Sequence, residues 1–142
     1  YMVATGLRAR DNAPLWLMEG MGQRPLFPPN VSGWKHNGYF VNTSAMTART
    51  DVARHFMWRT MRGYWDGDGL IRLGRGNLSK NEIENTYRDQ PEALVDRILS
   101  LMGVTASTES KNALYTYARN SEWWERNELV GLALMMPEMN VA

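Results

Sequence analysis

The two histidines, His36 and His55, are the side chains with the clearest capacity for acid–base chemistry. An imidazole titrates near neutral pH, so His36, which follows Trp34 and Lys35, could act as a general acid or base. A solvated loop histidine is the alternative interpretation, and His55 is expected on the polar face of a helix. No Cys or Glu lies three or four positions from either histidine. The spacing therefore does not predict a zinc site.

Two carboxylates, Asp66 and Asp68, form the second candidate group. In the run Asp-Gly-Asp-Gly-Leu-Ile they resemble the middle of a calcium loop, where oxygen ligands converge on the ion and glycine permits the turn. The rest of that pattern is missing, because Tyr64 occupies the first ligand position and Arg75 the twelfth. We therefore expect a polar turn, no high-affinity calcium site, and no metal or other cofactor.

Other catalytic signatures are absent from the sequence. The chain has no cysteine, which excludes disulfides, thiolate metal sites and cysteine nucleophiles. A Gly-x-Ser-x-Gly nucleophile motif and a phosphate-binding glycine loop are also missing. The sequence therefore identifies no catalytic residue, and whether the protein is an enzyme stays open.

The loop of residues 21–34 is the segment best suited to hold polar side chains in fixed positions. Its three prolines restrict the backbone to extended conformations, and its apolar residues could pin it to a core. We expect residues 23–34 to be ordered and Trp34 to be largely buried. Two interpretations follow, namely a packed connection between helices or the rim of a binding or catalytic site.

Several short motifs resemble those of one protein family. They are Met21-Gly22-Gln23, Phe27-Pro28-Pro29-Asn30-Val31, Gly33-Trp34, Val41-Asn42-Thr43 and Ala48-Arg49, followed near the C-terminus by Glu128 to Met139. In this order they are similar to the motifs of exported bacterial proteins in the domain-of-unknown-function eighteen hundred (DUF1800) family. The chain departs from the family pattern at Tyr39-Phe40, where a tryptophan is usual, and at Met136, where a serine is common.

The resemblance implies a mostly helical protein that is exported to the periplasm or the cell surface. It also implies that this chain is the C-terminal portion of that protein, and that a sulfatase-like protein encoded nearby is a candidate partner. No catalytic residue can be transferred from the family. The resemblance draws attention to five residues that would bind a partner or hold the loop, namely Asn30, Trp34, His36, Asn42 and Arg49. As an alternative, the asparagines bond loop backbone and the arginine holds buried carbonyl groups.

Length and composition predict one domain with a real core, since the chain has 142 residues, of which 44% are hydrophobic. The net charge is +1, but residues 1–65 hold eight basic and three acidic residues (+5), whereas residues 66–142 hold eight and twelve (−4). The basic part could face an acidic partner or polymer. Its arginines are dispersed, so we expect no nucleic-acid binding. No stretch approaches the ~20 apolar residues that cross a bilayer, so we expect no transmembrane segment.

Hydrophobic periodicity predicts an all-α domain with at most a short β-hairpin. The expected helical segments are residues 2–7, 13–21, 44–64, a short helix from 79, 91–102, 108–119 and 121–136. Ser79 and Glu82 have capping-box spacing, Gly103 should stop the helix before it, and Pro137 should end the last helix. The four glycines of residues 66–77 predict a surface turn or a hairpin.

The six tryptophans and ten methionines are unusual for a chain of this size. Large rings and flexible thioethers fill gaps between helices, so we expect core packing to explain most of the prominent aromatic residues. The alternative is a carbohydrate or partner surface made by ring stacking. The residues concerned are Trp34, Tyr39, Trp58, Trp65, Trp123 and Trp124.

Catalytic residue types are scarce, whereas Trp, Met and Arg, which are enriched at the centres of interfaces, are abundant. We therefore interpret the chain as a structural or interaction module at the cell surface that binds a protein or a surface polymer. The alternative is a hydrolase whose active site is completed by upstream sequence, with residues 23–36 as its rim.

Overall fold

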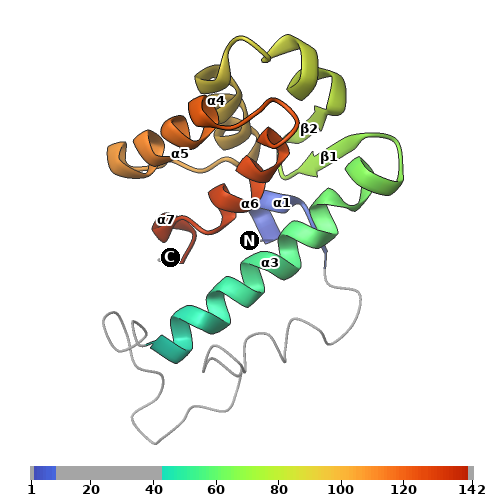
Figure 1. Cartoon of the computed structure of the whole chain (residues 1–142). Coiled ribbons are helices and arrows are strands. Elements are labelled where there is room, and N and C mark those ends of the chain that lie inside the picture. Colours follow the sequence, from blue (N-terminus) through green and yellow to red (C-terminus); the bar gives the residue numbers. More distant parts are fainter. Residues whose placement is uncertain (1, 9–42, 141–142) are drawn as a thin grey trace, which may run out of the picture. The chain divides into compact units, whose positions relative to one another are not determined.

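The computed structural model describes residues 2–8 and 43–140, and it is mostly helical (Figure 1). The helices are α1 (Met2–Thr5), α3 (Thr43–Asp66), α4 (Pro91–Met102), α5 (Thr108–Asn120), α6 (Leu129–Leu134) and α7 (Pro137–Asn140). A π-helix at Glu82–Thr86 and a 3-10 turn at Arg126–Glu128 complete the helical elements of this part of the chain. The helical fold class is confirmed. The predictions for residues 13–34 and 39–41 lie outside the described residues.

The chain divides into two compact units. One unit comprises residues 1–7 and 55–142, and the other comprises residues 8–54. Helix α3 runs through the boundary, so its residues 43–54 belong to the second unit and its residues 55–66 to the first. The buried core of α4, α5, α6 and the C-terminal half of α3 belong to the first unit.

The C-terminal half of α3 has both buried and exposed side chains. Thr60, Met61 and Tyr64 are buried, while Trp58 and Trp65 are exposed. The helix ends in a glycine-rich turn, where the Gly63 carbonyl accepts the N–H groups of residues 67 and 69 at 3.1 and 3.0 Å. The residue at 69 has φ of 71°, a conformation that glycine adopts without strain.

The expected hairpin follows this turn as β1 (Leu70–Leu73) and β2 (Gly76–Ser79), which pair antiparallel. Ile71 faces Leu78 across the ladder, and both are fully buried, whereas Arg72 on the other face is exposed. This alternation buries one face of the hairpin. The hairpin is also tied to α1, because the N–H group of Gly74 donates to the Ala4 carbonyl at 2.8 Å.

The predicted capping box is confirmed at the end of β2. The Ser79 hydroxyl accepts the Glu82 N–H at 3.1 Å, and the Glu82 carboxylate accepts the Ser79 N–H at 2.8 Å. Each side chain thereby satisfies a backbone donor that the start of a helix leaves free. Residues 82–86 continue as a π-helix, whose Ile83 is fully buried.

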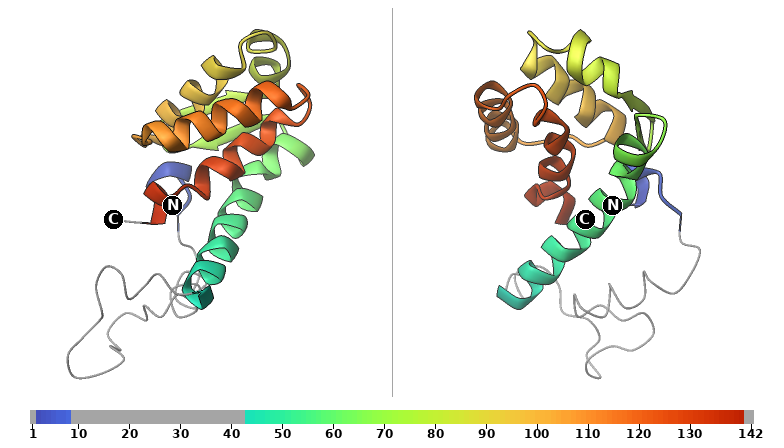
Figure 2. Two further views of the ribbon diagram at one scale, coloured as in Figure 1. Left: turned by 60° about the vertical axis from the view of Figure 1, so that its left-hand side comes forward. Right: turned by 45° about the vertical axis from the view of Figure 1, so that its right-hand side comes forward.

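Helix α4 has the predicted bounds, with Pro91 in its first turn and Gly103 after its last residue. Gly103 has φ of 69°, and its N–H donates to the Ser100 carbonyl at 3.1 Å, which closes the helix in the left-handed conformation. Six of its residues are buried, namely Leu94, Val95, Ile98, Leu99, Leu101 and Met102. The helix contacts α1, β2, α5 and α6, and Figures 1 and 2 show α4 and α5 side by side. It is therefore the centre of the core.

The prediction of one continuous helix at residues 121–136 is wrong. Residues 121–125 are not helical, a turn spans residues 123–125, and the short helix α6 (Leu129–Leu134) follows the 3-10 turn. The break begins where the Ser121 hydroxyl donates to the Tyr117 carbonyl at 2.7 Å and caps α5. Pro137 was expected to end a helix, but it begins α7, since proline lacks only an N–H that a first helical turn leaves unbonded.

Candidate functional site

Most of the predicted site residues lie outside the described part of the chain. Asn30, Trp34, His36 and Asn42 belong to this group, as does the loop of residues 23–36. Arg49 is described, and it is half-buried on α3. The roles proposed for these five residues stay predictions.

The side chain of Asp68 already has hydrogen-bond partners in the first strand of the hairpin. One carboxylate oxygen accepts the Leu70 N–H at 3.2 Å, and the other pairs with the Arg72 guanidinium at 2.5 Å. The hydrogen bond from Arg72 is the main reason that the pKa of Asp68 is lowered. Asp66 is exposed, and the described residues contain no group of three or more His, Cys, Asp or Glu that could hold a metal ion. A cation at Asp68 would have to compete with Arg72.

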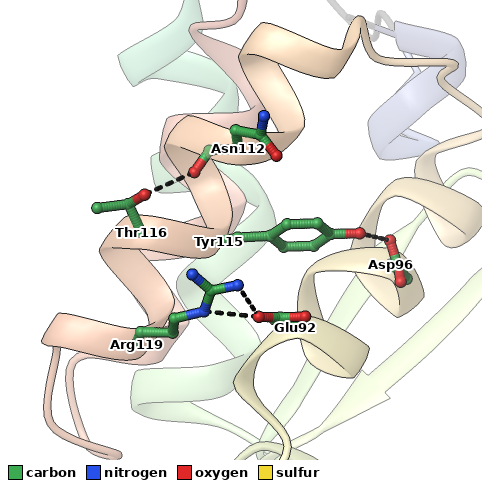
Figure 3. Close-up of polar contacts among 6 residues, drawn as sticks. All are labelled: Glu92, Asp96, Asn112, Tyr115, Thr116 and Arg119. Atoms are coloured by element: carbon green, nitrogen blue, oxygen red, sulfur yellow. Dashed lines mark hydrogen bonds and ion pairs between the residues drawn. The ribbon is translucent and has the colours of Figure 1, made fainter.

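A polar network joins α4 to α5 on the surface (Figure 3). The Arg119 guanidinium donates to Glu92, and the Tyr115 hydroxyl donates to Asp96 at 2.7 Å. Lys111 pairs with Asp96 at 3.2 Å. The hydrogen bond to Asp96 raises the pKa of both Tyr115 and Lys111. Glu92 and Asp96 lie one helical turn apart, but both have partners on α5, so the network fastens two helices.

The described tryptophans are not core residues, which corrects the expectation for Trp58, Trp65, Trp123 and Trp124. Trp58 is 60% exposed, Trp65 46% and Trp124 56%, while Trp123 is half-buried. The core is instead filled mainly by aliphatic side chains and methionine, together with Tyr64. Trp34 and Tyr39 lie outside the described residues. Because a tryptophan offers a large apolar area to a partner, the exposed indoles are the leading functional candidates.

Trp58 and Trp65 form an exposed pair on α3. Seven residues separate them, which places both on one side of the helix, only about 20° apart around its axis. Their ring centroids are 5.2 Å apart and their planes meet at 66°, an edge-to-face contact. Arg62 lies between them along the helix and is exposed. We call Trp58, Arg62 and Trp65 the α3 aromatic face.

Met57 and Tyr64, which lie about 80–120° around α3 from the two tryptophans, anchor the helix. Met57 lies against Gly131 of α6, where a Cβ atom would be only 3.2 Å from the Met57 Cγ and still closer to its sulfur. Tyr64 is buried beneath the Lys80 side chain, whose Nζ is 5.6 Å from the ring centroid. Burial, followed by the nearby Glu84 carboxylate, raises the pKa of Tyr64.

A second aromatic pair, Trp123 and Trp124, is partly covered by other side chains. Their ring centroids are 5.4 Å apart, and the Arg88 guanidinium lies 4.9 Å from the Trp123 ring centroid. The buried Arg126 holds the neighbouring turn by donating to the carbonyls of Tyr87 at 3.2 Å and Arg88 at 2.6 Å. One ring of this pair thus has a cation–π partner. The α3 aromatic face is the more open of the two surfaces.

The sequence contains only a partial signal for the α3 aromatic face. On a helical projection at about 100° per residue, Trp58, Arg62 and Trp65 fall within about 60° of one another. Tyr64 lies at least about 100° from each of them, but Met61 lies only about 40° from Trp65. The buried Met61 therefore borders the side of the helix that carries the two exposed tryptophans. The spacing places the two tryptophans on one side of the helix, but it does not show that the core leaves that side uncovered.

The comparisons with known proteins agree with the sequence motifs. A family model described as a protein of unknown function (DUF1800) matches residues 1–141. Searches of curated proteins and of solved structures found no significant match. No helix among the described residues is long and apolar enough to cross a membrane. The match covers nearly the whole chain, and the chain therefore belongs to the DUF1800 family.

Proposed function

We propose that this chain is an interaction module whose α3 aromatic face docks a protein partner. The observation that carries the proposal is the pair of adjoining indoles that remain 60% and 46% exposed on a helix that Met57 and Tyr64 anchor. Exposed apolar patches of this kind mark interaction surfaces, and Trp and Arg are the residues most enriched among binding hot spots.

The geometry of the indole pair favours a protein over a surface polymer. A sugar chain stacks best on rings that offer parallel faces along one line, whereas these two planes meet at 66°. An edge-to-face pair instead forms an angled surface that an apolar side chain can fill. The sulfatase-like protein implied by the family resemblance is the first candidate partner. The same resemblance supports a position in the periplasm or at the cell surface.

Site-specific photocrosslinking tests this proposal. A benzophenone amino acid would replace Trp58, Trp65 or, as a matched control of similar exposure, Trp124 in the protein expressed in its native source. The two α3 positions should crosslink to one common protein, which mass spectrometry identifies, and the control position should not. Crosslinking of the same protein from all three positions, or from none, contradicts the proposal.

The purified partner then allows an energetic test. Truncation of a hot-spot residue costs about 2 kcal/mol or more, which corresponds to roughly 30-fold weaker binding. Trp58→Ala and Trp65→Ala should each weaken the calorimetric Kd by about that factor, while Trp124→Ala leaves it nearly unchanged. Because the indoles are exposed, circular dichroism melting should show both α3 variants folded like the wild type. A Kd that is unchanged in both variants contradicts the proposal.

A further inference from the structure

The C-terminal part of α3 carries more positive than negative charge, and its terminal Asp66 forms no ion pair with the arginines among the described residues. Between Asp51 and Asp66 the sequence has three arginines and no Asp or Glu. Arg54 pairs with Asp51 at 3.3 Å, within the unit of residues 8–54. Arg59 and Arg62 are both exposed, and neither has an ion-pair or hydrogen-bond partner among the described residues. Two free guanidinium groups thus lie on or beside the α3 aromatic face.

The position of Arg62 couples its charge to any docking on the indoles. It lies four residues after Trp58 and three before Trp65, and therefore within one helical turn of each. A partner that covers both rings also removes water from this guanidinium. A charge that loses water without gaining an ionic partner is strongly unfavourable. The partner must therefore supply an acceptor at Arg62, and a carboxylate matches the planar fork of arginine best.

We infer that the segment docking on the α3 aromatic face is an acidic peptide segment of a protein partner. Its apolar side chains cover Trp58 and Trp65, and its carboxylates pair with Arg62 and Arg59. This inference rests on the proposed function and adds the chemistry of the partner. Arg59 lies about 60° around the helix from Arg62, so it pairs with a carboxylate at the edge of the same contact. Charge complementarity of this kind fixes specificity and raises the association rate.

Selection from a displayed library of random peptides tests the inference. We choose peptides of about 16 residues, because a helix of this size is about 24 Å long. The library would be selected on the full chain after depletion on the Trp58→Ala/Trp65→Ala variant. The enriched peptides should combine Asp or Glu with large apolar residues. Enriched peptides without an excess of acidic residues would overturn the inference while leaving the docking surface intact. If no peptide binds the full chain better than it binds the Trp58→Ala/Trp65→Ala variant, the proposal that this face is a docking surface is contradicted.

Charge reversal on the protein provides the matched measurement. Arg59→Glu/Arg62→Glu should weaken binding of a synthetic enriched peptide at least tenfold, whereas Arg75→Glu, an exposed arginine in the hairpin turn, should change it less than about threefold. Added salt should weaken the wild-type complex more than that of the Arg59→Ala/Arg62→Ala variant. Equal losses for the α3 reversal and the Arg75 control would contradict a specific role for Arg59 and Arg62.

Two further measurements test whether a polysaccharide or a second copy of the chain binds this face instead of an acidic peptide. Alginate, an anionic polysaccharide, should bind much more weakly than the acidic peptide, and its binding should not depend on Trp58 and Trp65. Alginate binding that is as tight and as dependent on these indoles would overturn the inference in favour of a polymer. Sedimentation of the wild-type chain and of the Arg59→Glu/Arg62→Glu variant tests for self-association through this face. We expect no self-association of the wild type that is lost in the variant. Such self-association would mean that a second copy of the chain covers the face.

Discussion

At the scale of single residues, side chains of the same type have different roles according to their position. Asp68 resembles a calcium ligand in the sequence, yet its carboxylate is engaged by Leu70 and Arg72. The sequence showed that the calcium pattern was incomplete, but it could not show which cation would occupy the carboxylate. The exposure of the tryptophans was predicted wrongly, because composition does not tell which side of a helix faces the core.

Gly131 lies where a side chain would meet Met57, which would have to shift to make room. Gly131→Ala places a methyl group against Met57. Overpacking costs about 1–3 kcal/mol, and the gain in helix propensity of roughly 0.5–1 kcal/mol offsets only part of it. We expect a net loss of about 1 kcal/mol in the free energy of unfolding, measured by urea denaturation.

The Met57→Ala background is the control for this prediction. Removal of the thioether should reverse the sign of the change in the free energy of unfolding. In this background Gly131→Ala should stabilise the protein by roughly 0.5–1 kcal/mol through helix propensity alone. If the glycine substitution has the same effect with and without Met57, the contact between α3 and α6 does not explain the glycine.

At the scale of elements, boundaries set by local signals were predictable. Both ends of α4 follow from Pro91 and Gly103, and the capping box of Ser79 and Glu82 forms as its spacing indicates. The break after α5 was not predictable, because Arg126 holds carbonyl groups 38 and 39 residues earlier in the chain. A helical pattern in the sequence contains no record of such distant contacts.

The capping box gives a direct prediction of stability. Ser79→Ala removes the acceptor of the Glu82 N–H, which should lower the free energy of unfolding by about 1 kcal/mol. Ser100→Ala is the matched control, because Ser100 is exposed on α4 and caps nothing among the described residues. That variant should stay within about 0.5 kcal/mol of the wild type. Equal losses in the two variants would show that the capping geometry is not the cause.

The start of α5 gives a prediction that depends on pH. Glu138 of α7 accepts the Ser107 N–H at 2.8 Å and the Ser110 hydroxyl at 3.0 Å. Hydrogen bonds from Ser107, and then from Ser110, lower the pKa of Glu138 from 4.5 to about 2. Because the pKa is lower in the folded state, the stabilisation is present above pH 4.5 and is lost as the pH falls toward 2.

Glu138→Gln should therefore lower the melting temperature at neutral pH. The difference from wild type should shrink as the pH falls from 4.5 to 2, where the wild-type carboxyl group is also neutral. Glu122→Gln, which removes an exposed carboxylate from the turn after α5, is the control and should leave the melting temperature nearly unchanged throughout. A Glu138→Gln difference that stays constant down to pH 2 would contradict the role of the charged form.

At the scale of the whole molecule, the fold supports a presentation role for α3. The helices α4, α5 and α6 contact one another in the core, Met61 and Tyr64 of α3 are buried, and Met57 of α3 lies against Gly131 of α6. The family and the helical fold class were predictable from the sequence, since the motifs and the periodicity are local. The proposed docking surface was not predictable, because it depends on which residues of α3 the core leaves uncovered.

Hydroxyl-radical footprinting of the protein, alone and with its purified partner, tests the central claim most directly. In the free protein Trp58, Trp65 and Trp124 should all be oxidised readily, because each is about half exposed or more. In the complex Trp58 and Trp65 should be protected, whereas Trp124 should remain as reactive as before. If Trp58 and Trp65 resist oxidation in the free protein, or stay equally reactive in the complex, then α3 does not present the docking surface.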